Sequence, residues 1–125
     1  MSETAKLAKV LLIVDNSLFI IERLLSILKE ANAITKIHTA TNYSGAVEVL
    51  HKSKTDIVLL DIQLSERNGI DLLKYVGLHF PTIKVVILSN LISDYYQKLC
   101  KEAGAVCFID KSNDFDKITE VMCSI

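Results

Sequence analysis

Five short apolar runs, separated by segments of helical period, constrain the fold of this chain more than any other feature. The runs are VLLIV, AITKIHT, DIVLL, IKVVIL and AVCFI, which begin at residues 10, 33, 56, 83 and 105. Four of them are almost continuously apolar, which is typical of strands covered on both faces. The intervening segments, about 10 to 15 residues long, repeat apolar residues at i, i+3 and i+4, as crossover helices do. The pattern predicts an α/β fold with a mostly parallel sheet between helices.

The second run, residues 33–39, alternates apolar and polar side chains, as expected for a strand at a sheet edge. Placing it there favours the strand order 2-1-3-4-5 of a doubly wound, flavodoxin-like (βα)5 sheet. Gly69, Pro81 and Gly104 stand where the pattern starts or ends helices. A length of 125 residues suits one domain, so we expect residues 1–125 to form a single unit.

Composition argues against several classes of protein. With 14 basic and 15 acidic residues the net charge is -1, so we expect no nucleic-acid partner. No apolar run approaches the roughly 18 residues of a membrane helix, and the N-terminus lacks a secretory core. We therefore expect a cytoplasmic protein without membrane contact. Cys100, Cys107 and Cys123 show no C-x-x-C spacing and the histidines are scattered, so neither disulfides nor a zinc site are predicted.

Polar residues follow four of the predicted strands at their carboxyl ends. They are Asp15, Asn16, Asp61, Ser89, Asn90, Asp110 and Lys111. Because the carboxyl ends of parallel strands face one crevice, we expect two carboxylates, an amide, a hydroxyl and an ammonium from these residues to converge there. Some have simpler explanations when taken singly, such as a helix cap for Asn16 or a solvated Lys111. Asp61, between two apolar runs, needs a partner to offset its desolvation, so the combination indicates a site.

The blocks LLIVDNS, DIVLLDIQLSERNGIDLL, VVILSN and CFIDKS resemble the ordered signature blocks of response-regulator receiver domains, which act in two-component signalling. The resemblance covers essentially the whole chain. It implies that Asp61 accepts a phosphoryl group from a sensor histidine kinase or a histidine phosphotransfer protein. It also implies a Mg²⁺ cofactor held by Asp15, Asn16, Asp61 and the backbone carbonyl of Gln63. Such a chain is a phosphoryl acceptor with at most slow self-dephosphorylation, not an enzyme.

The resemblance further assigns a switch and an output surface. Ser89 and Lys111 would contact the phosphoryl group, and Ser89 and Phe108 would change position after its arrival. Phosphorylation adds about 1.5 to 2 negative charges, which can bias a two-state surface. That surface, formed by residues 91–99, 105–109 and 113–125, would bind a downstream protein in trans. Self-association as a homodimer is left open.

Five positions depart from the family pattern: Asn16 replaces an acid, Ser65 and Ser112 replace prolines, Asn90 replaces a small residue, and Phe108 lacks a tyrosine hydroxyl. An amide oxygen can ligate Mg²⁺ without the charge of a carboxylate, so a lower metal affinity is expected. The Lys111–Ser112 peptide is expected to be either trans or a strained cis bond.

Three aromatic residues are candidates for partner binding. Phe19 falls outside the apolar stripe of the first predicted helix, which favours either kinase docking or packing against a loop. Of Tyr95 and Tyr96, one can face the core with Ile92 and Leu99 while the other points elsewhere.

Three other kinds of protein are alternatives to the phosphorylatable receiver. A receiver-like module that binds proteins without phosphorylation would explain Asn16 as a weakened metal site. A dehalogenase-type phosphatase would need a second acid where Gln63 stands. A flavodoxin would need a glycine-rich phosphate loop, which DNSLFI does not provide.

Overall fold

The computed structural model describes residues 9–31, 34–64, 67–91 and 93–125. One parallel sheet has the strand order β2-β1-β3-β4-β5, which confirms the predicted topology. Its strands are β1 (Lys9–Val14), β2 (Ile34–Ala40), β3 (Ile57–Leu60), β4 (Lys84–Ser89) and β5 (Cys107–Asp110).

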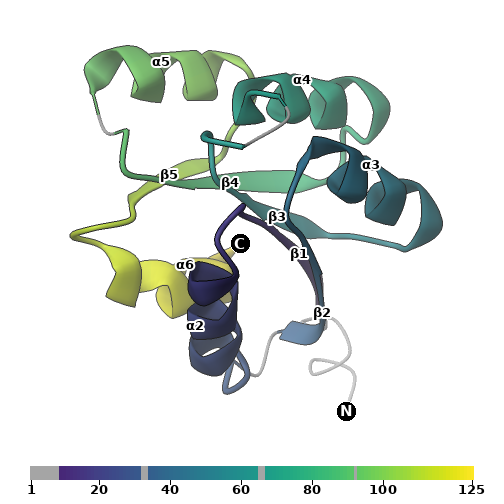
Figure 1. The fold of residues 1–125 in the computed structure, drawn as a ribbon, viewed down its shortest axis with the longest axis vertical. Coiled ribbons are helices and arrows are strands. Elements are labelled where there is room, and N and C mark those ends of the chain that lie inside the picture. Colours follow the sequence, from purple (N-terminus) through teal and green to yellow (C-terminus); the bar gives the residue numbers. More distant parts are fainter. Residues whose placement is uncertain (1–8, 32–33, 65–66, 92) are drawn as a thin grey trace.

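Helices cover both faces of the sheet. They are α2 (Leu18–Leu28), α3 (Tyr43–Lys52), α4 (Gly69–His79), α5 (Asp94–Glu102), the short 3-10 helix η1 (Phe115–Lys117) and α6 (Ile118–Ser124). Figure 1 shows α3, α4 and α5 on one face and α2 and α6 on the other. Within the described ranges, no helix has the length and apolarity needed to span a membrane.

The two-sided burial explains the continuous apolar runs. Along β1, Leu12 and Val14 join the hydrophobic cluster under α3, α4 and α5, whereas Leu11 and Ile13 join the cluster under α2 and α6. Successive side chains point to opposite faces of a strand, so a strand between two helix layers has no solvent face. The edge strand β2 is mostly half-exposed or exposed, in agreement with its alternating sequence.

Polar residues determine where the helices begin at the carboxyl ends of the strands. Ser17, Asn42, Asn68 and Ser93 cap α2, α3, α4 and α5, each accepting a backbone N–H of the first turn. The cap of α2 is therefore Ser17, whose hydroxyl accepts from Ile20, and Asn16 lies one residue outside it. This leaves the side chain of Asn16 exposed and available for another role.

Gly69 is required where α4 begins beside Asp61. A Cβ atom added there would lie 2.4 Å from the carbonyl oxygen of Asp61 and 2.7 Å from the Cα of Ile62. The Gly69 amide donates to the Ile62 carbonyl at 2.6 Å, so the backbones meet directly. The glycine thus sets the close approach of α4 to the segment that carries Asp61.

We expect Gly69→Ala to lower the free energy of unfolding by about 2 kcal/mol, because overpacking against backbone atoms forces a local shift. Urea unfolding measures the change. Gly77→Ala, on the same helix, is the matched control, since its added Cβ would have only a contact at 3.8 Å with the Ala103 carbonyl. The control should be neutral or slightly stabilising. Equal losses in both variants would contradict the steric argument.

Candidate functional site

Three of the predicted polar residues meet at the carboxyl edge of the sheet. Asp15 follows β1, Asp61 follows β3 and Lys111 follows β5. The Nζ atom of Lys111 lies 2.8 Å from Oδ2 of Asp15 and 3.0 Å from Oδ2 of Asp61. One ammonium group therefore bridges two carboxylates that are 46 residues apart in the sequence.

This group of charges is almost closed to solvent. Asp15 is 2% exposed and Asp61 is 5% exposed, and the side chain of Lys111 is 10% exposed. Burial raises the pKa of Asp61 above its ordinary value of 3.8, although the ammonium of Lys111 partly opposes this rise. Burial works to lower the pKa of Lys111, but hydrogen bonds to both carboxylates and their charges outweigh it, so its pKa is raised. Lys111 is consequently a cation at neutral pH.

Backbone amides orient both carboxylates. Oδ1 of Asp15 accepts from the Ser17 amide at 2.9 Å, and Oδ1 of Asp61 accepts from the Gln63 amide at 3.1 Å. Each carboxylate thus presents one oxygen to Lys111 and the other to the residue two positions later. Both bonds are local consequences of the chain turning sharply as it leaves a buried strand.

The oxygen atoms at this edge suit a hard cation. Two carboxylates each accept a hydrogen bond from the same ammonium group. The side chain of Asn16 is exposed beside Asp15. Across the described part of the chain, no three His, Cys, Asp or Glu side chains are grouped as metal ligands. A metal here would need an amide oxygen and a backbone carbonyl in addition to the two acids, and Mg²⁺ accepts such ligands. The donor chemistry therefore fits Mg²⁺, and ligation by Asn16 and Gln63 stays a prediction.

Ser89 and its neighbours border the charged group. Ser89 is fully buried, its hydroxyl oxygen accepts from the Leu91 amide at 2.9 Å, and its carbonyl accepts from the Lys111 amide. The Lys111–Ser112 peptide is trans, which decides between the two predicted conformations. Ser65, another predicted departure, lies outside the described residues.

A contact between two loops was missed by sequence reasoning. The hydroxyl of Ser112 donates to Oδ1 of Asn90 at 2.8 Å. Each partner directly follows a residue of the candidate site, Ser89 and Lys111 respectively. Asn90 and Ser112 are separate departures from the family pattern, and their occurrence together is the signal available in the sequence.

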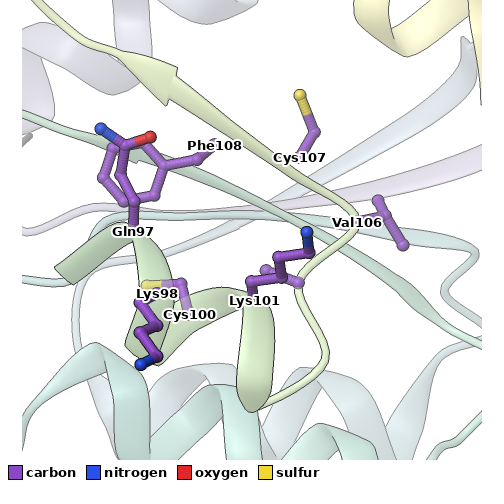
Figure 2. A pocket seen from close by; sticks show the side chains of 8 residues that line it. Gln97, Lys98, Cys100, Lys101, Val106, Cys107 and Phe108 are labelled. Carbon is purple, nitrogen blue, oxygen red and sulfur yellow. The ribbon is translucent and has the colours of Figure 1, made fainter. Parts of the chain in front are cut away.

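Phe108 lies on the face of β5 that packs against α5. Figure 2 shows its ring directed toward α5 beside Gln97, while the side chain of Cys107 points to the opposite side of the strand. A cavity of about 370 Å³ opens there, and its lining includes Gln97, Lys98, Cys100, Lys101, Val106 and Phe108. The predicted output surface, now α5, β5 and α6, thus contains a hollow with an apolar floor and two lysines.

The aromatic candidates differ in exposure. Phe19 is 71% exposed and its neighbour Leu18 is 66% exposed, so neither is covered by a loop. Tyr95 is exposed, whereas Tyr96 is half-buried against the cluster that contains Leu99, as predicted for this pair. Ile92, the other expected neighbour, lies outside the described residues.

Comparison with known proteins identifies relatives that match most of the chain. Residues 11–122 match the sequence profile described as the response regulator receiver domain. The chain is 32% identical over 116 residues to the chemotaxis protein CheY of Thermotoga maritima, covering 93% of this chain and 96% of that protein. It is 33% identical over 114 residues to a protein-glutamate methylesterase/protein-glutamine glutaminase of Sulfurimonas denitrificans, covering 88% of this chain and 32% of that protein.

Solved structures show the same fold. The response regulator domain of Thermotoga maritima CheB superposes with a TM-score of 0.82 at 25% identity, covering 94% of this chain and 92% of that one. A two-component response regulator from Clostridium difficile superposes with a TM-score of 0.85 at 22% identity, covering 93% of each chain. The chain spans about a third of the length of the methylesterases it matches, and nearly the full length of CheY.

Proposed function

Because this chain belongs to the response-regulator receiver family, we propose that it accepts a phosphoryl group on Asp61 and thereby switches a protein-binding surface. One observation carries the proposal: Nζ of Lys111 contacts Asp15 and Asp61 together, inside a nearly closed site at the carboxyl edge of the sheet. A lone buried acid could be structural. A buried acid paired with a second acid and a shared cation has the parts that phosphoryl transfer requires.

The proposed reaction uses the ionised carboxylate of Asp61. One carboxylate oxygen attacks the phosphorus of the donor, and the bond from phosphorus to the donor's leaving group breaks with its electron pair on that group. Lys111 is held beside Asp61, so its charge stabilises the negative oxygens of the phosphoryl group. The Gln63 amide keeps the carboxylate oriented during the approach. Burial of the site keeps water away from the reacting atoms.

Mg²⁺ is the proposed cofactor, with Asp15, Asn16, Asp61 and the backbone carbonyl of Gln63 as its protein ligands. When bound, it supplies positive charge next to the phosphoryl oxygens. With both carboxylates ionised and Lys111 protonated, the described side chains of this group carry a net charge of about -1. An acid in place of Asn16 would add one more negative charge, and divalent cations bind more tightly to more negative sites.

We expect Asn16→Asp to tighten Mg²⁺ binding about tenfold, as measured by titration calorimetry. Asn42→Asp is the matched control, because it adds the same charge at the cap of α3 and keeps a capping side chain. Its Mg²⁺ affinity should equal that of the unsubstituted chain. If Asn16→Asp left the affinity unchanged, Asn16 would not be a metal ligand.

The proposed switch joins the site to the output surface. A phosphoryl group on Asp61 draws the Ser89 hydroxyl and Lys111 toward it, which moves the ends of β4 and β5. Phe108 lies on β5, two residues before Asp110, and contacts the cluster under α5. A displacement of β5 would therefore alter the hollow between α5 and β5, where a downstream protein is proposed to bind. Exposed Tyr95, on the first turn of α5, is a candidate contact for that protein.

The proposed phosphoryl donor is a histidine kinase or phosphotransfer protein that docks beside α2. Phe19 and Leu18 form an exposed apolar pair in the first turn of α2, directly after the Asp15–Ser17 turn. An exposed aromatic residue next to a reacting site is a suitable anchor for a partner surface.

We expect Phe19→Ala to slow phosphotransfer from the cognate kinase about tenfold while labelling by a small donor continues at the same rate. Leu78→Ala removes an equally exposed apolar side chain on α4 and should leave both rates unchanged. The measurement is the rate of transfer from radiolabelled kinase to each variant. An unaltered kinase rate for Phe19→Ala would reject docking at this pair.

The experiment that tests the main proposal is the intact mass of the protein after incubation with a small phosphoryl donor, with and without Mg²⁺. A Mg²⁺-dependent gain of one phosphoryl group is expected. The alternative is a receiver-like protein that binds its partners without phosphorylation, which the amide in place of an acid at position 16 favours. No gain from a small donor or a kinase at high Mg²⁺ would favour that alternative.

A further inference from the structure

Asn90 and Ser112 connect two loops that leave neighbouring strands of the sheet. The Ser112 hydroxyl donates to Oδ1 of Asn90 at 2.8 Å across 22 positions of sequence. Directly beside this bond, the Lys111 amide donates to the Ser89 carbonyl at 2.9 Å. The loop that follows Ser89, the last residue of β4, is therefore joined to the loop that contains Lys111 by a side-chain bond next to a backbone bond.

Ser112 is held firmly where it makes this contact. Its amide donates to Oδ1 of Asp110 at 2.9 Å, and the Asn113 amide donates to the same oxygen at 3.3 Å. The hydrogen bonds from Ser112 and Asn113 lower the pKa of Asp110, so this carboxylate is ionised at neutral pH and remains a strong acceptor. The turn thus fixes the backbone from which the Ser112 side chain extends toward Asn90.

One of the joined loops contains Lys111, and the other begins directly after Ser89, the last residue of β4. Lys111 contacts Asp61 through Nζ, and Ser89 is completely buried with its hydroxyl oxygen bonded to the Leu91 amide. Separation of the loops would carry Ser89 and Lys111 apart and would open the edge of a site in which Asp61 is 5% exposed. Local openings of this kind involve a few bonds and are controlled by them.

We propose that Asn90 and Ser112 are positioning residues whose hydrogen bond holds the two loops together and so prolongs the life of a phosphoryl group on Asp61. This inference rests on the proposed function. In hydrolysis, the oxygen of a water molecule attacks phosphorus, and the bond from phosphorus to the Asp61 oxygen breaks with its electron pair on the carboxylate. The products are the free carboxylate, inorganic phosphate and a proton released to solvent. The rate depends on how often water reaches the phosphorus, and the link reduces that frequency.

The size of the effect follows from the strength of one hydrogen bond. A net contribution typical of hydrogen bonds in proteins changes an equilibrium between closed and open loops by roughly three- to ten-fold. Hydrolysis that proceeds through the open form changes by the same factor. The hydrogen bond needs both side chains, so removing either Asn90 or Ser112 removes its whole effect on the rate of hydrolysis.

The test follows the loss of phosphate from labelled protein by intact mass after the small donor has been removed. Asn90→Ala and Ser112→Ala should each accelerate the loss three- to ten-fold, and the double variant should be no faster than the faster single variant. Ser112→Thr keeps a hydroxyl and should restore the slow loss. Asn113→Ala is the matched control, because its side chain bonds only to Oδ2 of Asp110 among the contacts described, within a single loop.

Unchanged loss in both alanine variants would overturn the proposal, as would effects that multiply in the double variant or an equal acceleration in Asn113→Ala. If the unsubstituted protein takes up no phosphate, the proposed function fails by itself. The link is then judged from hydrogen exchange of the Lys111 amide, which is bonded to the Ser89 carbonyl. Exchange three- to ten-fold faster in Asn90→Ala and Ser112→Ala supports a link between the loops, and equal exchange rejects it.

Discussion

Replacing Lys111 by methionine is expected to lower the free energy of unfolding by about 3 kcal/mol at neutral pH. Methionine keeps much of the length of the side chain but removes the ammonium that lies 2.8 and 3.0 Å from two buried carboxylates. Removing one partner of a buried ion group leaves uncompensated charge in a region of low polarity, which is strongly destabilising. Urea unfolding at neutral pH measures the loss.

Lys117→Met is the matched control for this change. Lys117 forms an exposed pair with Asp114 at 3.3 Å, and its side chain is 63% exposed. Exposed pairs contribute little, so the control should lie within about 0.5 kcal/mol of the unsubstituted chain. Similar losses for the two variants would show that the buried position of Lys111 has no special electrostatic role.

The pH dependence of Lys111→Met has a definite sign. Burial raises the pKa of Asp61 above the ordinary value of 3.8, and Lys111 partly counteracts that rise. Without the lysine, the pKa of folded Asp61 rises further. A carboxyl group with a raised folded pKa supports folding fully below its unfolded pKa, and that support is lost as the pH rises through the folded pKa. The destabilisation should therefore shrink as the pH falls toward 3.8, and a constant difference across this range would contradict the argument.

The fold could be predicted because its main signals are repeated along the chain. Strands buried on both faces are apolar at nearly every buried position, and the apolar residues of β1, β3 and β4 are divided between the hydrophobic clusters on the two faces. The mixed polarity of β2 predicted its edge position, which agrees with the strand order 2-1-3-4-5. These features depend on averages over several residues, so single substitutions do not obscure them.

The meeting of Asp15, Asp61 and Lys111 was predictable for a related reason. Parallel strands bring their carboxyl ends to one edge, so residues directly after them lie close together whatever the intervening sequence. The shared contact of both acids with Nζ of Lys111 confirms the convergence. Their chemical roles stay predictions, because geometry alone does not show a reaction.

Details that depend on one or two torsion angles could not be predicted. Asn16 and Ser17 are both good capping residues, and only the backbone path assigns the cap to Ser17. The hydrogen bond from the Ser112 hydroxyl to Asn90 depends on the trans peptide before Ser112 and on the side-chain torsion of Ser112, and the sequence predicts neither. The hollow beside Phe108 likewise depends on how α5 and β5 pack.

Asp61→Asn is expected to abolish the gain of one phosphoryl group from a small donor, to below a hundredth of the original rate, an effect of at least about 2.7 kcal/mol in activation free energy. The single amide oxygen can keep only one of the two contacts, from the Gln63 amide at 3.1 Å or from Lys111 at 3.0 Å, and the NH₂ group then faces the other donor. The amide is not a competent nucleophile, so the change removes the chemistry and keeps the shape. Intact mass after incubation with the donor and Mg²⁺ measures the loss.

Two controls separate the loss of a nucleophile from a loss of folding. Burial raises the pKa of Asp61, which means that its charge opposes folding, so the neutral amide should leave stability unchanged or slightly increased in urea unfolding. Asp71→Asn alters a carboxylate on α4 whose side chain is 46% exposed, and it should be labelled at the original rate. If Asp61→Asn still gained a phosphoryl group, another carboxylate would be the acceptor, with Asp15 the first to test because it shares the same ammonium.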